Sequence, residues 1–447
     1  MMSKTGTKEM MINKEPKDRF NVNVLHALIL GIGSLLGYNL IISSVDYFLA
    51  AFPNHSQLSF LLSPMHTLPD LLCLTLLIPF GGKFSYTFQI ISGFVLTSLL
   101  FALVPVFIEL CIEDTAFIYI LIVFGIDGVL TSVLTVSVRA YYNYLPKKYV
   151  TANVSGQAIA GIVASLLRVL TKLIEPDGKN GFIQGGRIYF ISGAIFCLIC
   201  IISYVWTNST ELVKHYFNKS LYITRKELKI GHRHSVINSH SKHLIDVNEV
   251  INKTANNIGS INSVSKEILN CNDIPVSYWD VFLKIKSLLV AVFTIHFVTF
   301  LVFPGLLVGL NSEYQILRND GWFSVIIILE FNVFDYIGRH FIANYSSFGL
   351  NKNNLWIASL VRILLYPIFL AMYLNMFPVK DWMAHIATLL LGVTHGFIVC
   401  ICFQTQPTIV NPNEQHIAAA ITTLTLVIGI TTGSYTTLGI SKFLKKL

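Results

Sequence analysis

The chain has 447 residues, of which 53% are hydrophobic and 13% are charged. Because charged residues make up about 25% of an average soluble domain, this composition excludes an ordinary soluble protein and indicates an integral membrane protein. The net charge of +8 is compatible with nucleic-acid binding, but the basic residues cluster in segments between apolar runs. Membrane orientation explains that pattern better, so we expect no nucleic-acid partner.

Apolar runs long enough to cross a lipid bilayer recur along the whole chain. A transmembrane helix needs roughly 20 mostly apolar residues, and we count about eleven such runs. They fall near residues 25–48, 57–80, 86–109, 116–138, 152–174, 187–206, 285–309, 321–339, 354–375, 383–407 and 416–440. The sequence therefore predicts an all-α membrane protein with about eleven transmembrane helices.

A hydrophilic segment divides these runs into two groups. Residues 207–279 are rich in Asn, Ser and Lys and lack a sustained helical period, which is typical of a mostly disordered connector. The predicted organisation is an N-terminal tail (1–24), a six-helix bundle (25–206), this connector and a five-helix bundle (280–447).

The distribution of basic residues between the runs predicts the orientation. The tail, the connector and the segment between the fourth and fifth runs, with Arg139, Lys147 and Lys148, are basic, whereas residues 45–82 contain no Lys or Arg. Positive charge favours the cytoplasmic side, so we expect the tail and connector in the cytoplasm and, with an odd number of spans, the C-terminus outside. Some basic residues contradict this pattern: Lys172, Lys179 and Arg187 between the fifth and sixth runs, and Lys442, Lys445 and Lys446 near the C-terminus.

Tyr38 and Asn39 form a possible ligand contact in the first run. An aromatic plane beside an amide suits a flat, hydrogen-bonding ligand, but the glycine-rich run by itself favours helix packing with Tyr38 at the interface.

Asp127 is an acid in the fourth run, followed one turn later by Thr131. No base lies within one turn of Asp127 in its own helix. Such an acid either couples transport to protons or is a hydrogen-bonded carboxyl without a transport role.

Gln157 lies in the fifth run on one helix face with Gly161, Ser165 and Arg168. Its amide can donate and accept hydrogen bonds at once, as the edge of a purine or pyrimidine requires. A hydrogen bond between helices is the alternative role.

The eighth run ends in an acid and a base one helical turn apart, Asp335 and Arg339. Their i,i+4 spacing puts both side chains on one face, within reach of each other, and Asn332 and Tyr336 are expected on that face too. A charged side chain deep in a bilayer costs about 2.5 to 3.5 kcal/mol. The pair therefore either lines or gates a polar path, or only locks helices together.

Other chemistry is not indicated. The sequence has no Ser-His-Asp order, no HExxH, no paired-carboxylate spacing and no GxxxxGK[ST]. His296 and His395 occur singly, and a single buried histidine is usually just hydrogen-bonded. We therefore expect no enzyme activity, no cofactor and no metal, and favour a facilitator or an ion-coupled carrier.

Several motifs in the right order resemble the equilibrative nucleoside transporters. They are GIGSLLGYN with VDYF, SGQAIAG, FPG, FNVFDYIGR, LVRILLYP and THGF, in the first, fifth, seventh, eighth, ninth and tenth runs. The resemblance implies a major-facilitator-like fold working by alternating access. It also implies that Asp335 and Arg339 are the family's acid–base pair and that Gln157 lines the nucleoside site.

Three departures from the family pattern concern substrate range. Tyr38 stands where the family usually has Trp, Thr131 and Ser132 where the fourth helix usually has Gln, and Thr-His-Gly replaces Ser-Asn-Gly in the tenth run.

Together these observations predict a carrier of nucleosides or nucleobases. The predicted substrate-binding residues are Tyr38, Asn39, Thr131, Gln157, Asp335 and Arg339. We expect the carrier to be equilibrative, to act as a monomer in the lipid bilayer and to lie in the plasma membrane. The alternatives are a proton-coupled nucleoside carrier using Asp127, a carrier of another small polar solute, and a membrane receptor that transports nothing.

Overall fold

The computed structural model describes residues 16, 18–55, 57–80, 84–174, 179–219, 277–342, 354–411 and 414–444. Regular secondary structure in these residues is entirely helical, as the apolar runs predict.

The first half of the chain forms seven helices after a short 3-10 turn at Arg19–Asn21. They are α2 (Val22–Ser43), α3 (Val45–Ala51), α4 (Leu58–Phe80), α5 (Tyr86–Leu110), α6 (Glu113–Tyr142), α7 (Lys147–Ile174) and α8 (Lys179–Ser209).

The second half begins with a helix that is interrupted by Phe303 and Pro304. Its elements are α12 (Tyr278–Val302), α13 (Gly305–Val308), α14 (Gln315–Asn319), α15 (Trp322–Ile337), a π-helical turn (Gly338–Ile342), α16 (Leu355–Val361), a 3-10 turn (Arg362–Leu364), α17 (Leu365–Tyr373), α18 (Asp381–Ile409) and α19 (Gln415–Leu444).

Ten helices among the described residues are long and apolar enough to cross a membrane. The remaining predicted run, 321–339, corresponds to α15, which has only 16 residues but continues into the five-residue π-helical turn. Both parts pack against α18. The helices therefore agree with the expected number of about eleven spans.

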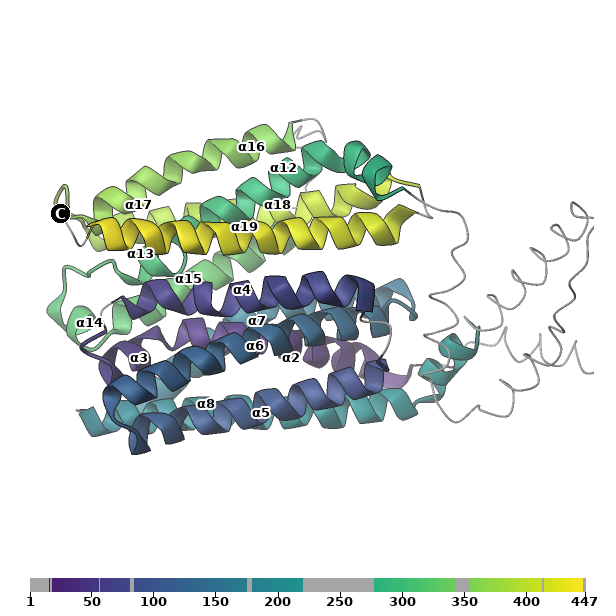
Figure 1. Cartoon of the computed structure of the whole chain (residues 1–447), viewed down its shortest axis with the longest axis horizontal. Coiled ribbons are helices and arrows are strands. Elements are labelled where there is room, and N and C mark those ends of the chain that lie inside the picture. Colours follow the sequence, from purple (N-terminus) through teal and green to yellow (C-terminus); the bar gives the residue numbers. More distant parts are fainter. Residues whose placement is uncertain are drawn as a thin grey trace, which may run out of the picture.

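The helices form two groups that lie side by side. The elements α2–α8 occupy the lower part of Figure 1 and α12–α19 the upper part, except that α14 lies at the left, level with α4. The groups meet mainly where α7 packs on α15 and where α4 packs on α19. Most of the predicted connector lies outside the described residues. Its described residues 211–219 are helical and pack Phe217 against Tyr141 of α6 and against Tyr144, which follows α6.

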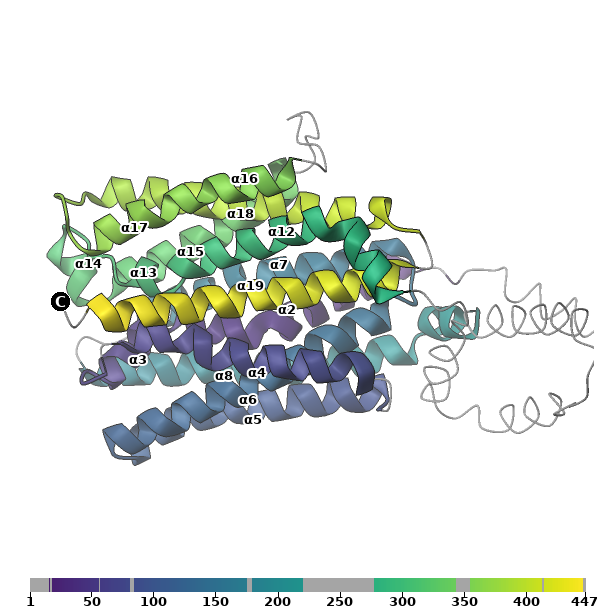
Figure 2. The ribbon, with the colours of Figure 1, turned by 45° about the horizontal axis from the view of Figure 1, so that its top comes forward.

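The two ends of the bundle are distinct. We call the end where α8 finishes and α12 begins the connector end, and the opposite end the far end (Figure 2). The chain enters α2 at the connector end and leaves α19 at the far end (Figure 1).

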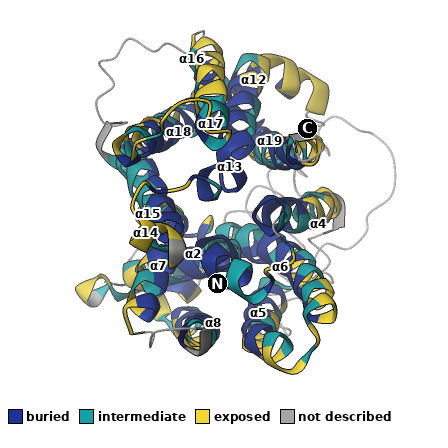
Figure 3. Cartoon of the chain, turned by 90° about the vertical axis from the view of Figure 1, so that its left-hand side faces the viewer, coloured by how far each residue is buried: buried dark blue, intermediate teal, exposed yellow. Residues whose placement is uncertain are grey.

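Exposed residues lie on the outside of the bundle, and the buried residues face its interior (Figure 3). Many of the exposed residues are large and apolar. Leu103, Ile122 and Ile202, for example, are 41%, 52% and 68% exposed. In a bilayer such side chains contact lipid, so burial of apolar surface does little to hold the helices together.

Glycines allow the close helix contacts that hold such a bundle together. At Gly31 of α2 and Gly156 of α7, a Cβ atom would collide with the backbone of the facing helix. At Gly392 and Gly396 of α18, it would collide with the backbone of α15. The second seam fixes the rotation of α18, which turns the neighbouring His395 toward α15.

Candidate functional site

Asp335 and Arg339 form the ion pair that their spacing predicts. The Arg339 Nε atom donates to Asp335 Oδ2 at 2.8 Å, and Nη2 donates to Oδ1 at 3.3 Å. The Asp335 side chain is 13% exposed, whereas that of Arg339 is 28% exposed. Arg339 lies in the π-helical turn, a distortion often found at functional sites. The Arg339 side chain is thus more open than the carboxylate it pairs with.

His395 belongs to the same polar cluster. Its Nδ1 lies 2.7 Å from Asp335 Oδ1, and its ring packs edge-on against His296 at 5.2 Å. It is hydrogen-bonded as expected of a buried histidine, but its partner is the acid of the predicted site. The feature of the sequence that could have indicated this contact is the adjacent Gly396. A glycine at a close helix contact orients the residues next to it toward the facing helix.

Asn332 points to the other side of α15. Its Nδ2 donates to Ser165 Oγ at 2.9 Å and to the Gly161 carbonyl at 3.3 Å, both on α7. Asn39 of α2 approaches the same place, because a Cβ atom at Gly161 would lie 3.0 Å from its Oδ1. Two amides, one from each bundle, therefore meet over Gly161. Tyr336 instead stacks on His340, with ring centroids 4.1 Å apart.

Gln157 is held by side chains of two other helices. Its Oε1 accepts a hydrogen bond from Arg139 Nη2 at 2.6 Å, and its Nε2 donates to Ser34 Oγ at 3.2 Å. The expectation that Arg139 lies in the segment between two spans is wrong, because α6 continues to Tyr142 and Arg139 turns into the bundle.

Asp127 has a base partner that its own helix does not supply. The Nε2 of His66, on α4, lies 3.2 Å from Asp127 Oδ2, and the two side chains are 2% and 0% exposed. The ring of Tyr38 lies 4.9 Å from that of His66, and its hydroxyl is 3.4 Å from Ser63 Oγ. Thr131 is buried one turn beyond Asp127. The sequence did not single out His66, because the contact joins two helices.

A row of aromatic rings connects the two polar clusters. Successive centroids are 6.4 Å, 6.2 Å, 4.3 Å and 6.2 Å apart. The row runs through Tyr38, Phe300, Phe303, Phe331 and His395. Flat apolar surfaces with polar groups at their ends are what a heterocyclic base requires.

A second charged cluster lies toward the far end. Arg168 donates to Asp46 through Nε at 3.0 Å and Nη2 at 2.7 Å, and Lys172 Nζ lies 2.9 Å from the same carboxylate. Lys172 also lies over the ring of Trp322 in the other bundle, 5.5 Å from its centroid. Lys172 is therefore neutralised inside the bundle, which explains why it contradicts the charge pattern of the loops.

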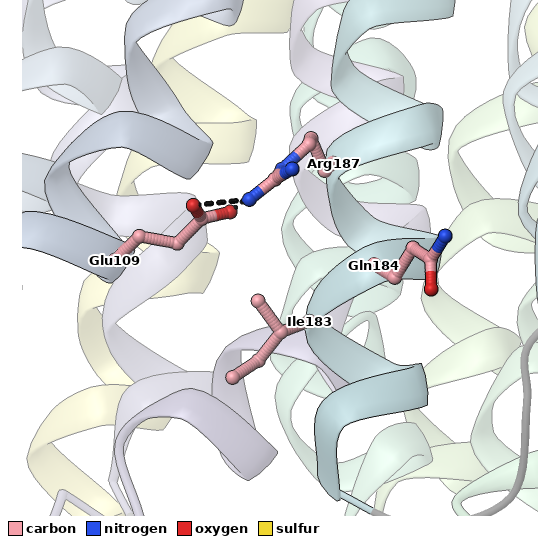
Figure 4. A pocket seen from close by; sticks show the side chains of 4 residues that line it. All are labelled: Glu109, Ile183, Gln184 and Arg187. Atoms are coloured by element: carbon pink, nitrogen blue, oxygen red, sulfur yellow. Dashed lines mark hydrogen bonds and ion pairs between the residues drawn. The ribbon is translucent and has the colours of Figure 1, made fainter.

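A separate pocket of about 320 Å³ opens between α5 and α8. Glu109, Ile183, Gln184 and Arg187 line it, and Glu109 pairs with Arg187 across it (Figure 4). It contains none of the predicted substrate-binding residues, so we do not assign the site to it. Arg187, like Lys172, has its charge balanced by an acid.

Two helical bundles with polar side chains at their interface define the class of major-facilitator-like membrane transporters. A D-xylose–proton symporter has this fold, with a TM-score of 0.58 at 12% identity over 92% of this chain and 89% of that chain. The xylose transporter XylE of E. coli, in a partially occluded inward-open form, gives a TM-score of 0.57 at 14% identity, covering 94% of this chain and 91% of the other.

Residues 120–440 match the nucleoside transporter family, and the chain belongs to that family. It is 25% identical over 430 residues to equilibrative nucleotide transporter 1 of Arabidopsis thaliana, covering 94% of this chain and 86% of the relative. It is also 25% identical to the human equilibrative nucleoside transporter 4, and the match covers 94% of this chain and 82% of the relative. The protein is thus an integral membrane transporter and not an enzyme.

Proposed function

We propose that the protein moves nucleosides and nucleobases down their gradients by alternating access, with the substrate held between the two bundles. The observation that carries this proposal is the Asp335–Arg339 pair on α15, the helix that packs against α7 of the other bundle, with the Arg339 side chain 28% exposed. A charge pair inside membrane helices is costly, and it is usually retained for function.

The side chains around the pair suit a nucleoside. Arg339 can donate to a carbonyl or ring nitrogen of the base, and Gln157 can both donate and accept. Tyr38 and the aromatic row offer flat surfaces, while Asn39 and Thr131 supply further polar groups. This assignment of roles rests on the chemistry of the side chains and on their positions near the interface.

The contacts between bundles suit rocking motion. Ser63 and Ser434 hydroxyls are 2.8 Å apart, and Thr431 donates to the Thr67 carbonyl at 3.2 Å, both between α4 and α19. Neutral hydrogen bonds of this kind contribute only about 0.5 to 1.5 kcal/mol each. They can therefore break and re-form as the bundles move.

We infer that the connector end faces the cytoplasm. Lys147 and Lys148 are exposed there, at the start of α7, whereas Lys172, Arg187 and Lys380 pair with acids. Unpaired positive charge favours the cytoplasmic side. We further propose that the protein acts as a monomer in the plasma membrane.

Uptake of radiolabelled adenosine by cells that lack their own nucleoside carriers tests the proposal. Saturable uptake that excess unlabelled nucleosides and nucleobases reduce is expected. Uptake that only sugars or cations compete for would indicate a carrier of another solute. Absence of saturable uptake for every nucleoside and base tried, with the protein at the cell surface, would indicate a receptor.

The buried His66–Asp127 contact supports proton coupling as the second candidate. An acid and an imidazole, 3.2 Å apart, are both groups that can bind and release a proton. The pH dependence of uptake separates this mechanism from uncoupled transport.

A further inference from the structure

Arg139 lacks the counter-charge that three other arginines of the described spans have. Arg168 is paired with Asp46, Arg187 with Glu109 and Arg339 with Asp335. Among the described residues, no carboxylate pairs with Arg139, and its hydrogen-bond partner is the neutral amide of Gln157.

Comparison with Arg362 shows that Arg139 also has guanidinium donors without hydrogen-bond partners among the described residues. Arg362 has no acid partner either, but its guanidinium makes four hydrogen bonds, to Thr394, Thr299 and two backbone carbonyls. In Arg139, only Nη2 has a partner, and the buried Nε has none within the described part of the chain. Arg362 is thus a structural crosslink, whereas Arg139 retains donors for another group.

The guanidinium of Arg139 lies well inside the bundle. Its partner Gln157 follows the start of α7 at Lys147 by ten residues, about 15 Å of helix. A long basic side chain this close to the end of its helix ordinarily extends toward the membrane surface. Arg139 instead points inward, and keeping an uncompensated charge there costs several kcal/mol.

We propose that Arg139 is the anchor of an oxyanion subsite that takes a phosphate group, either free or as part of a nucleoside monophosphate. The planar guanidinium suits the tetrahedral oxyanion because its donors form a rigid fork. The second hydrogen of the Gln157 amide nitrogen supplies another donor beside it. Because no carboxylate of the described residues pairs with Arg139, an anion there would not compete with one of them.

This subsite adjoins the nucleoside site through Gln157. The position of the nucleoside part therefore rests on the proposed function, whereas the binding of the phosphate group does not. A nucleoside monophosphate would occupy both, with its base toward Arg339 and its phosphate at Arg139.

Displacement of radiolabelled adenosine from the full-length purified protein tests the proposal. The competitors are adenosine, adenosine 5′-monophosphate and inorganic phosphate, at constant ionic strength. The monophosphate is expected to displace adenosine from the wild type. In Arg139→Gln its potency should fall about tenfold or more relative to that of unlabelled adenosine, because charged hydrogen bonds are lost. Arg139→Lys, which keeps the charge, should lose less.

Two further variants sharpen the comparison. Gln157→Glu places a carboxylate opposite Arg139, so its thermal unfolding should show no stabilisation by phosphate over chloride at equal ionic strength. Arg187→Gln removes a peripheral arginine and should behave as the wild type does. Equal potencies of inorganic phosphate and monophosphate would identify free phosphate as the ligand. A more potent monophosphate would identify the nucleotide.

Adenosine binding that neither phosphate compound reduces would overturn the subsite and leave the proposed function intact. Equal displacement in wild type and Arg139→Gln would also overturn it. If Arg139→Gln binds no adenosine, thermal unfolding of the wild type and of Arg139→Lys tests whether phosphate binds. Saturable stabilisation by phosphate over chloride at equal ionic strength, weaker in the lysine variant, is expected. If phosphate does not stabilise the wild type more than chloride does, the proposed subsite is wrong.

Discussion

The Nδ1 of His395 lies 2.7 Å from Oδ1 of Asp335, so a side chain of α18 fixes the acid of α15. Because Arg339 bonds Oδ2 of the same carboxylate at 2.8 Å, both carboxylate oxygens have partners. The acid–base pair of α15 is therefore part of a three-residue unit. This unit ties the geometry of the candidate site to the packing of two helices.

We expect Asp335→Asn and Arg339→Leu each to abolish most nucleoside uptake. Either change leaves the other charge unpaired inside the bundle, at a cost of about 3 to 5 kcal/mol. Uptake and surface labelling should be measured together, and at least one variant should reach the membrane. Glu109→Gln, which breaks a solvent-exposed pair that contributes little to stability, is the control. Near-normal uptake in both variants would remove the pair from the mechanism.

His395→Leu should reduce transport, and His395→Asn should restore much of it. Leucine leaves Asp335 without one donor, whereas an asparagine amide can donate to the same oxygen. The loss of a hydrogen bond to a charged group corresponds to about 1.5 to 3 kcal/mol. The KM and the maximal rate of adenosine uptake should be compared in both variants. Equal defects in the two would show that only the volume of the imidazole matters.

Tyr38→Trp should change the order of substrate preference without abolishing transport. The larger ring alters the surface next to His66 and Phe300 and removes the hydroxyl contact with Ser63. Competition of adenosine uptake by a panel of nucleosides and bases measures the order. An unchanged order would place Tyr38 outside substrate selection.

Asp46→Asn should destabilise the protein strongly, because Arg168 and Lys172 then lie buried without a counter-charge. The expected loss is about 3 to 5 kcal/mol. Lys172→Met should cost less, since the Arg168–Asp46 pair remains balanced. Thermal unfolding in detergent measures both. A midpoint for Asp46→Asn equal to that of the wild type would show that the cluster does not stabilise this conformation.

Uptake should be nearly independent of external pH between about 5.5 and 8, apart from histidine effects near pKa 6.5. This result is expected because transport is proposed to be uncoupled from protons, so that the contact between His66 and Asp127 is only structural. Wild type and Asp127→Asn should be compared with and without a protonophore. Stimulation by acid that the protonophore collapses and the variant lacks would instead make Asp127 the coupling group.

The sequence alone determined the features that depend on local spacing. Spans follow from the length of apolar runs, because a bilayer of fixed thickness requires roughly 20 residues per helix. The Asp335–Arg339 pair follows from i,i+4 spacing within one helix. Family membership was likewise indicated by short motifs in order, and the family match agrees with it.

Only the tertiary structure decided which side chains from different helices meet. It brought His395 to Asp335, His66 to Asp127 and Arg139 to Gln157. Such contacts depend on how each helix is rotated and how closely it approaches its neighbours. Glycine seams such as Gly392 and Gly396 set both quantities. Periodicity gives the faces of a single helix, but in lipid the choice of facing partner arises from close packing across the whole bundle.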